Sequence, residues 1–175
     1  MEELNLSTTT WIDFENDLFD AACLAIKDFQ RIVDAEGRKI YQISIWTHLG
    51  MLSVLAIETL QHAKSSIEKG AKFWFDRHDL ETARRVQAME SNGNPADFEF
   101  PRVLELQHSE SLSDLQPPEE LEDAITQHQE NVLRRILESG VLTTSNCEDY
   151  IWVGVSSKDD WYDHERKVAI KDRNP

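Results

Sequence analysis

The sequence predicts an α+β domain with a mainly antiparallel sheet and helices packed on one face. Apolar residues recur at spacings of three and four in residues 11–34 and 118–139, which is the period of a helix. They alternate or run together in residues 39–57 and 150–155, which is typical of strands. Because the order is helix, hairpin, helix, variable middle, helix and strand, we expect the helices to lie against one sheet.

The first helix is predicted over residues 11–34. Asp13 suits the positive end of the helix dipole, and Gly37 follows the expected end, where glycine is common. Cys23 widens the apolar face, so we interpret it as a buried thiol. The apolar face itself is formed by Leu18, Ala22, Ala25, Phe29, Ile32 and Val33.

An antiparallel hairpin is predicted next. In residues 39–47 apolar and polar positions alternate, with Ile43 and Trp46 on opposite faces, which indicates a half-buried strand. Residues 51–57 are apolar on both faces, so this strand is expected at the centre of the sheet. The short link at 48–50 favours a hairpin.

The middle of the chain is predicted to hold two helices. The first is expected from Glu58 or Thr59 to Lys69 and to end at Gly70. The aromatic cluster at 73–75 is interpreted as a short strand or the anchor of a loop. A second helix is expected over residues 80–90, with Asp79 as its N-terminal cap.

The last part of the chain is predicted to add one helix and two strands. Residues 97–100 alternate and indicate an exposed edge strand or extended segment, whereas residues 103–116 are interpreted as an irregular loop. A helix is expected over 118–139 and a strand over 150–155, followed by a short closing segment at 159–170. No internal repeat is present, so a single domain over residues 1–175 is expected.

Acidity is the most pronounced property of the composition. The chain has 33 acidic and 18 basic residues, for a formal net charge of −15. Such a field repels nucleic-acid phosphate and anionic lipid and accelerates encounter with basic proteins. We therefore expect a basic protein partner, with no direct nucleic-acid binding and no membrane; the alternative is an acidic surface that only keeps the chain soluble.

The charge is segregated along the sequence. Residues 97–130 contain ten acidic residues and a single basic one, Arg102. Residues 64–86 contain six basic and four acidic residues and are mildly positive. Segregation of this kind favours a docking surface over a uniform solubilising charge.

The start of the chain and its cysteines indicate a cytoplasmic protein. Residues 1–10 lack the basic and apolar regions of a signal peptide, and the longest apolar run is too short to cross a bilayer. The two cysteines, Cys23 and Cys147, have no CxxC spacing, which suits a reducing compartment and two buried thiols.

Catalytic and metal motifs are not found in the sequence. GxSxG, GxGxxG, GxxxxGK[ST] and HExxH are all missing, so we expect no enzyme activity, no catalytic residue and no cofactor. The densest group of possible metal ligands is interpreted as a solvated helix start, and no metal site is expected. The alternative is a small enzyme or ligand-binding domain with its site near His48 or His164. That group of possible ligands is Asp159, Asp160, Asp163, His164 and Glu165.

Three parts of the chain resemble an uncharacterised, mostly bacterial group, the domain of unknown function family 4303. They are the opening helix, the hairpin with residues 40–46 and 58–60, and the ending with residues 150–155, 159–161 and 174–175. Residues 71–116 depart from that family. Small, acidic, cytoplasmic families of this kind look like immunity proteins of bacterial toxin systems, so the resemblance implies an antitoxin role.

Charge and resemblance together lead to one expected function. We expect a non-enzymatic immunity protein that occludes the active groove of a basic toxin domain, for example a nuclease, because carboxylates can mimic nucleic-acid phosphate. A structural or regulatory subunit is a third alternative. Trp74 and Trp161 are candidates for exposed aromatic anchors, with packing in the core as the favoured alternative. The expected acidic partner-binding residues are Asp97, Glu99, Glu105, Glu110, Asp114, Glu119, Glu120 and Asp123.

Overall fold

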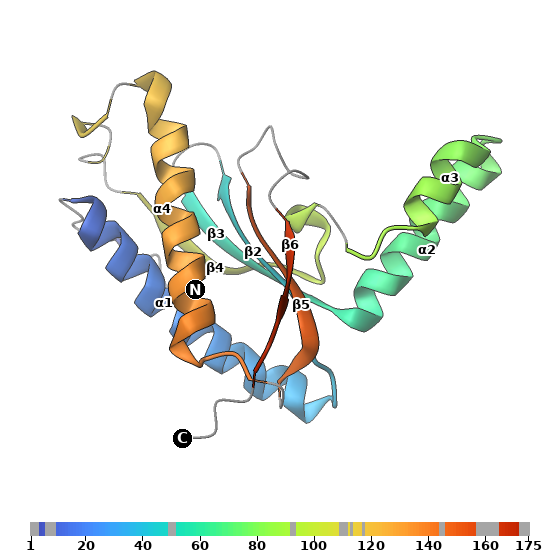
Figure 1. Ribbon diagram of the computed structural model, residues 1–175, viewed down its shortest axis with the longest axis horizontal. Coiled ribbons are helices and arrows are strands. Elements are labelled where there is room, and N and C mark those ends of the chain that lie inside the picture. Colours follow the sequence, from blue (N-terminus) through green and yellow to red (C-terminus); the bar gives the residue numbers. More distant parts are fainter. Residues whose placement is uncertain are drawn as a thin grey trace.

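Six strands form one mixed sheet in the order β1-β4-β3-β2-β5-β6 (Figure 1). Three neighbouring pairs are antiparallel, β2–β3, β3–β4 and β5–β6, whereas β1–β4 and β2–β5 are parallel. The predicted α+β class with a mainly antiparallel sheet is therefore confirmed. The strands are β1 (Leu4–Asn5), β2 (Ile40–His48), β3 (Leu52–Thr59), β4 (Phe100–Gln107), β5 (Cys147–Ser156) and β6 (Arg166–Ala169).

The computed structural model describes most of the chain. The described residues are 4–5, 10–48, 52–91, 94–108, 112, 114–116, 118–143, 146–156 and 165–171.

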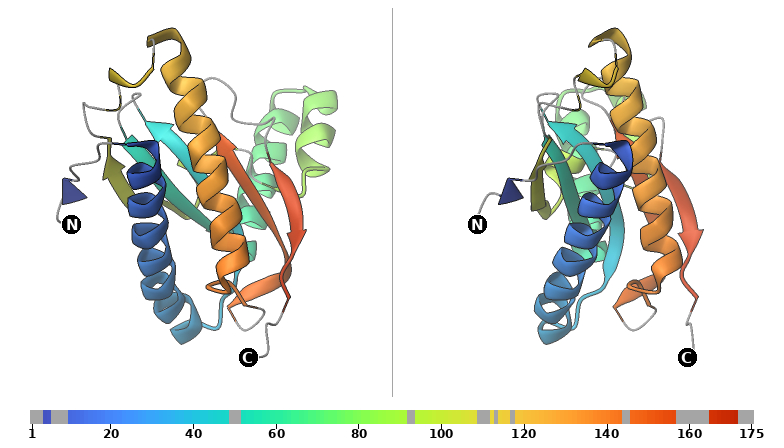
Figure 2. Two further views of the ribbon diagram at one scale, coloured as in Figure 1. Left: turned by 60° about the vertical axis from the view of Figure 1, so that its left-hand side comes forward. Right: turned by 90° about the vertical axis from the view of Figure 1, so that its left-hand side faces the viewer.

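Two long helices, α1 (Trp11–Ala35) and α4 (Pro118–Ser139), lie side by side over one face of the sheet (Figure 2). Both were predicted from their apolar period. The turn after α1 contains Gly37 at φ +64°, and Gly140 follows α4 at φ 78°, which explains why both helices end there.

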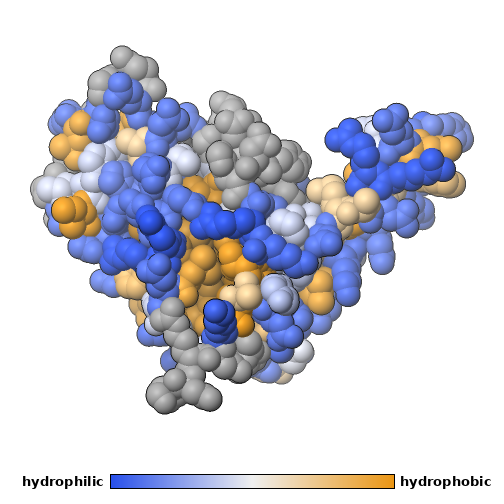
Figure 3. Space-filling view, viewed as in Figure 1, coloured by the Kyte–Doolittle hydropathy of each residue, from blue (hydrophilic) through white to orange (hydrophobic). Residues whose placement is uncertain are grey.

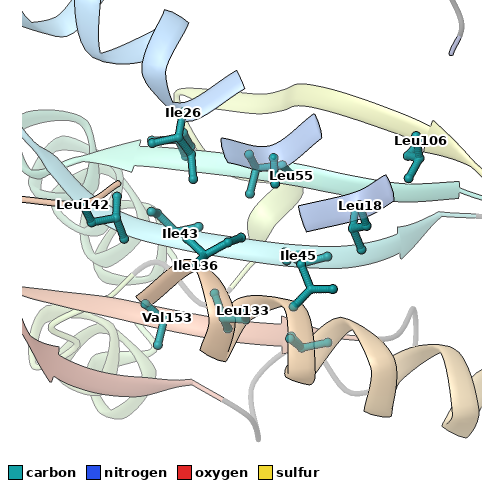
Figure 4. Packing of buried hydrophobic residues seen from close by; sticks show 14 of the residues in the cluster. Leu18, Ile26, Ile43, Ile45, Leu55, Leu106, Leu133, Ile136, Leu142 and Val153 are labelled. Carbon is teal, nitrogen blue, oxygen red and sulfur yellow. The ribbon is translucent and has the colours of Figure 1, made fainter. Parts of the chain in front are cut away.

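The main core lies between these two helices and the sheet (Figure 4). Alternate residues of the central strands point into it, because successive side chains of a strand face opposite sides. The core residues labelled in Figure 4 are Leu18 and Ile26 of α1, Ile43 and Ile45 of β2, Leu55 of β3, Leu106 of β4, Leu133 and Ile136 of α4, Val153 of β5, and Leu142.

The prediction that β2 is half-buried is wrong, because its second face is covered as well. Gln42, Ser44 and Trp46 all point away from the helices and are nevertheless buried. Trp46 packs with Phe98 in a second, smaller apolar cluster. The segment that leads into β4 covers this face, which the local sequence period of β2 could not reveal.

The helix α2 (Leu60–Asp76) begins directly after β3, and Thr59 caps it by accepting a hydrogen bond from the His62 backbone N–H. The prediction that it ends at Gly70 is wrong, and so is the prediction of a strand or loop anchor at 73–75, which forms its last turns. A Cβ on Gly70 would lie 3.2 Å from the side chain of Val86, so this glycine lets a second helix approach closely instead of ending the first.

The second helix of this pair, α3 (Leu80–Gln87), begins as predicted at the cap Asp79, whose side chain accepts a 3.0 Å hydrogen bond from the Thr82 backbone N–H. His78, at φ 62°, makes the tight turn between the two helices. Together α2 and α3 form a helical hairpin that projects away from the sheet (Figure 1). We call this hairpin the arm.

The predicted loop at 103–116 is wrong for its first part. Residues 103–107 belong to β4, which pairs with β3 and places Leu106 in the main core. A short 3-10 helix (Pro95–Asp97) precedes this strand. The strand predicted at 150–155 is confirmed and extends over Cys147–Ser156, and most of the closing segment at 159–164 lies outside the described residues.

Candidate functional site

The solvent-facing sides of α1 and α4 form one acidic surface, which we call the acidic layer. The two helices contain twelve acidic and four basic residues, a net of −8 out of the −15 of the chain. They run in the same direction, since Glu15 contacts His128 and Gln30 contacts Val141. Both N-termini therefore lie toward the same end, where the helix dipoles favour the carboxylates.

Glu15 joins the two helices. Its carboxylate accepts hydrogen bonds from His128 (2.6 Å) and Asn131 (2.7 Å), and Trp11 stacks on the His128 ring at a centroid distance of 4.5 Å. Partial burial would raise the pKa of Glu15, but the hydrogen bonds from His128 and Asn131 outweigh it and lower the pKa. This carboxylate is thus part of the helix packing and is not available to a partner.

Other carboxylates at the N-terminal end of the acidic layer have no such internal role. Glu120, Glu122 and Asp123 are exposed, and Asp17 is partly exposed. Within the described part of the chain, none of these four forms an ion pair. The layer therefore presents uncompensated negative charge at this end.

The predicted acidic segment 97–130 does not form one patch. Phe100 pairs with Ile57 near the end of β3, and Gln107 pairs with Leu52 at its start, so β4 separates the first acidic residues of the segment from α4. Asp97 and Glu99 lie before β4, whereas Asp114, Glu120 and Asp123 follow it.

Three of the predicted partner-binding carboxylates are already engaged inside the protein. Asp97 accepts a 2.7 Å hydrogen bond from the Asn94 side-chain amide. Glu99 is bound by the Arg38 guanidinium and by the Thr59 hydroxyl, and Glu105 pairs with Arg102 at 2.6 Å. Glu110, Trp161 and His164, together with the side chains of Glu119 and His48, lie outside the described residues.

The arm has the opposite charge. It contains six basic and four acidic residues, a net of +2. Aromatic side chains gather near its tip, where Trp74 is 37% exposed and Phe75 is 61% exposed. The Arg77 guanidinium lies 3.5 Å from the centroid of the Phe73 ring, which is a cation–π contact. Trp74 thus lies at the surface and is not packed in the core, which was the favoured alternative, and its role as an anchor stays a prediction.

A groove of about 720 Å³ runs along the arm to the edge of the body. Its lining is mostly apolar, and Lys64 and Lys72 lie among its polar residues. Apolar surface is visible on the arm among hydrophilic side chains (Figure 3). The apolar residues of the groove are Leu60, Ala63, Ile67, Ala71, Phe75, Ala83 and Met89.

Buried polar contacts fix the root of the arm where β3 becomes α2. Glu58 is 0% exposed, and its carboxylate lies 3.0 Å from His62 Nδ1 and accepts a 3.2 Å hydrogen bond from the Glu99 backbone N–H. Burial raises the pKa of Glu58, although the hydrogen bond from His62 opposes this. The contact ties the first turn of α2 to the segment before β4.

A second set of contacts fixes the other root, after α3. Glu165 accepts hydrogen bonds from Gln42 and, at 2.7 Å, from Ser91. Burial raises the pKa of Glu165 to about 7. Next to it, Glu90 pairs with Lys167 at 2.8 Å and its carbonyl accepts a 2.6 Å hydrogen bond from the Tyr41 hydroxyl.

The residues of both roots were missed in the sequence. Glu58 was assigned to the start of a helix, although a carboxylate at the end of an apolar strand was a signal that it is buried with a partner. The described residues contain no cluster of three or more histidine, cysteine or carboxylate side chains suited to a metal ion. No helix in the described part is long and apolar enough to span a membrane.

Comparisons with known proteins returned no match, whether to a family model, a curated protein or a solved structure. The resemblance to family 4303 therefore stays a prediction.

Proposed function

We propose that this protein is a non-enzymatic binding protein that docks a positively charged protein at the N-terminal end of its acidic layer. We further propose that the partner is a toxin domain that the protein neutralises. The observation that carries the proposal is the set of carboxylates there, Asp17, Glu120, Glu122 and Asp123, which form no ion pair with a described residue.

Uncompensated carboxylates act on a basic partner in two ways. Their field steers the partner toward the correct encounter and raises the association rate. Their spacing along two neighbouring helices also offers several acceptors to lysine and arginine side chains that would otherwise bind phosphate. A toxin with a cationic groove, such as a nuclease, is the kind of partner that this surface fits.

The buried carboxylates do not favour an enzyme. Glu58 and Glu165 are held by internal hydrogen bonds, and neither contributes to the lining of the groove along the arm. The side chain of His48 and the whole of His164 lie outside the described residues, so the alternative site near them stays a prediction.

The test is co-purification from the native cell followed by measurement of association. The variant Asp17→Asn/Glu120→Gln/Glu122→Gln/Asp123→Asn removes four charges from the acidic layer. A matched control, Glu68→Gln/Asp76→Asn/Glu81→Gln/Asp149→Asn, removes four exposed charges outside the acidic layer. We expect a basic partner to associate more slowly with the first variant and with a shallower dependence on salt, whereas the control behaves more nearly like the wild type.

The toxin part of the proposal is tested by co-expression. The captured partner should stop cell growth when expressed alone, and the wild-type protein should restore growth better than the four-charge variant. Equal association rates for both variants at low salt would contradict the proposed docking surface. A harmless partner would leave the docking surface in place and contradict the toxin assignment.

A further inference from the structure

The exposed apolar side chains of this protein are concentrated on two elements. Among the described residues, eight of the ten large ones lie on α1 or on the arm and the residue just after it. Exposed apolar patches of this kind mark interaction sites. The eight are Ile12, Leu24 and Ile32 on α1, Phe73, Trp74, Phe75 and Leu80 on the arm, and Met89 after α3.

The basic side chains of the arm form no close ion pair with a described residue, although the pKa of the Asp79 carboxyl is lowered by hydrogen bonds from Thr82 and, to a lesser degree, by nearby Arg85. Elsewhere Arg38, Arg102 and Arg166 each form an ion pair with a glutamate. On the arm, by contrast, no lysine or arginine forms an ion pair with a described residue. The arm is therefore an aromatic protrusion with free positive charge on a protein that is otherwise strongly acidic.

A complementary groove lies on the body, between α1 and the start of β4. Its volume is about 550 Å³, and its apolar lining includes Leu24, which is 62% exposed, and Ile32. Phe29 and Phe100 meet edge to face within it, at a centroid distance of 4.6 Å.

The charged residues of the groove lining, Asp28, Glu99 and Arg102, are each already ion-paired. The negative charge that could meet the arm lies elsewhere on α1, at exposed residues such as Asp20 and Asp34, which form no ion pair with a described residue.

The arm of a single copy does not cover this groove. Because α2 begins directly after β3, with no linker between them, its direction is set by the strand. It points away from α1, which lies on the other side of the body (Figure 1). The polar contacts of Glu58 and Glu165 hold both roots of the arm in this direction.

We propose that the arm of one copy docks into the α1–β4 groove of a second copy. The arm of the second copy docks in the same way into the groove of the first, so that the exchange is reciprocal. The aromatic tip fills the groove, and the lysines and arginines of the arm approach the acidic side chains of α1. Reciprocal exchange closes the assembly as a two-fold dimer. It forms the same contact twice, which helps the pair reach the roughly 800 Å² per partner of a stable interface.

This dimer is compatible with the proposed function and does not depend on it. The arm covers the C-terminal half of α1, around Leu24 and Ile32. The N-terminal end of the acidic layer, with Asp17, Glu120 and Asp123, stays accessible. Loss of the dimer and loss of partner binding are therefore separate results.

The test is the mass of the full-length protein in solution, measured by light scattering and sedimentation. The wild type is expected at twice its chain mass of 20.2 kDa. Phe75→Asp on the arm and Leu24→Arg on α1 should each raise the dimer dissociation constant by more than about tenfold. Tyr150→Asp is the matched control, because Tyr150 is 56% exposed on β5 and belongs to neither surface. Circular dichroism confirms that each variant is folded.

A mixture of the two monomeric variants distinguishes arm exchange from a general loss of solubility. Phe75→Asp keeps an intact groove and Leu24→Arg keeps an intact arm, so an equal mixture should form heterodimers that neither variant forms alone. A monomeric wild type, a dimer unaffected by both variants, or a control as disruptive as Phe75→Asp would overturn the proposal. A monomeric wild type that instead sediments with mixed phosphatidylcholine and phosphatidylserine vesicles would overturn it in favour of a lipid surface.

Discussion

The acidic layer and the arm are both built from pairs of amphipathic helices, yet they are held in different ways. In the layer, α1 and α4 each bury a continuous apolar face against the sheet. In the arm, the described buried residues of the two helices are Ala63 and Ala83 alone. The apolar helix faces are thus buried in the acidic layer, whereas those of the arm remain largely exposed to solvent.

Because of this difference, the two regions contribute differently to the stability of the fold and to the binding of partners. Regions with few buried apolar contacts open with low free energy, and binding surfaces are drawn from such regions. The layer therefore belongs to the stable core of the fold, and its N-terminal end offers mainly charge to a partner. The arm contributes little to the core, and it offers both charge and apolar surface.

The largest expected effect is a core substitution beneath the layer. Leu133→Ala removes a fully buried side chain of α4 and should lower the free energy of unfolding by about 2–5 kcal/mol. Phe75→Ala on the arm tip should change it by less than about 0.5 kcal/mol, because this side chain is mostly exposed. Urea unfolding of both variants at protein concentrations below dimer formation measures the difference. Equal losses would contradict the contrast between layer and arm.

The next effect concerns the root that joins the two regions. Burial raises the pKa of Glu165 from 4.5 to about 7, so the folded protein binds more protons than the unfolded chain between these values. Its contribution to stability is therefore lost as the pH rises from about 4.5 through 7. Glu165→Gln should flatten this dependence and stabilise the protein above pH 7 by about 3 kcal/mol at most.

Thermal unfolding of Glu165→Gln at a series of pH values measures this effect. The variant Glu68→Gln, on the exposed side of the arm, is the control for the removal of one charge. If both variants shift stability equally at every pH, the burial of Glu165 has no energetic consequence.

A smaller effect is expected at Glu15, which joins α1 to α4 within the acidic layer. The pKa of Glu15 is lowered, so its contribution to stability is present above the unfolded value of 4.5 and is lost as the pH falls through the folded value. Glu15→Gln should lower the free energy of unfolding by about 1 kcal/mol at neutral pH. The difference from the wild type should shrink as the pH falls below 4.5, which unfolding at pH 7 and at a series of acidic pH values measures.

The smallest effect on global stability is expected at the cap of α3. Asp79→Ala removes the acceptor for the Thr82 backbone N–H. Amide hydrogen exchange in α3 should become several-fold faster while exchange in β2 and β3 is unchanged, because the arm opens without the core. Faster exchange throughout the sheet would mean that arm and body unfold together.

The outcome of the sequence predictions follows the range of the interactions involved. The helices α1 and α4, the β2–β3 hairpin and the cap Asp79 were predicted because their signals lie within one segment. Gly70 was misread as a helix end, since its role depends on Val86, which lies in another helix. Residues 103–107 were misread as a loop, since only pairing with β3 makes them a strand.

The candidate site divides in the same way. The sequence revealed the excess of acid in residues 97–130 and the mildly basic charge of residues 64–86, both of which are sums over neighbouring residues. The sequence did not reveal that the Glu99 carboxylate is bound by Arg38, or that the Glu15 carboxylate is bound by His128. The partners of these two pairs lie 61 and 113 positions apart in the sequence, respectively, so no local pattern predicts either pair.

The acidic character, the periods of the helices and strands and their caps were determined by the sequence itself, because each depends on residues within a few positions. Only the tertiary structure decided which carboxylates remain unpaired and which apolar helix faces remain open. Both depend on what the fold brings next to each side chain. For that reason the charge of the acidic layer could be anticipated, whereas the arm, its two polar roots and the groove that fits it could not.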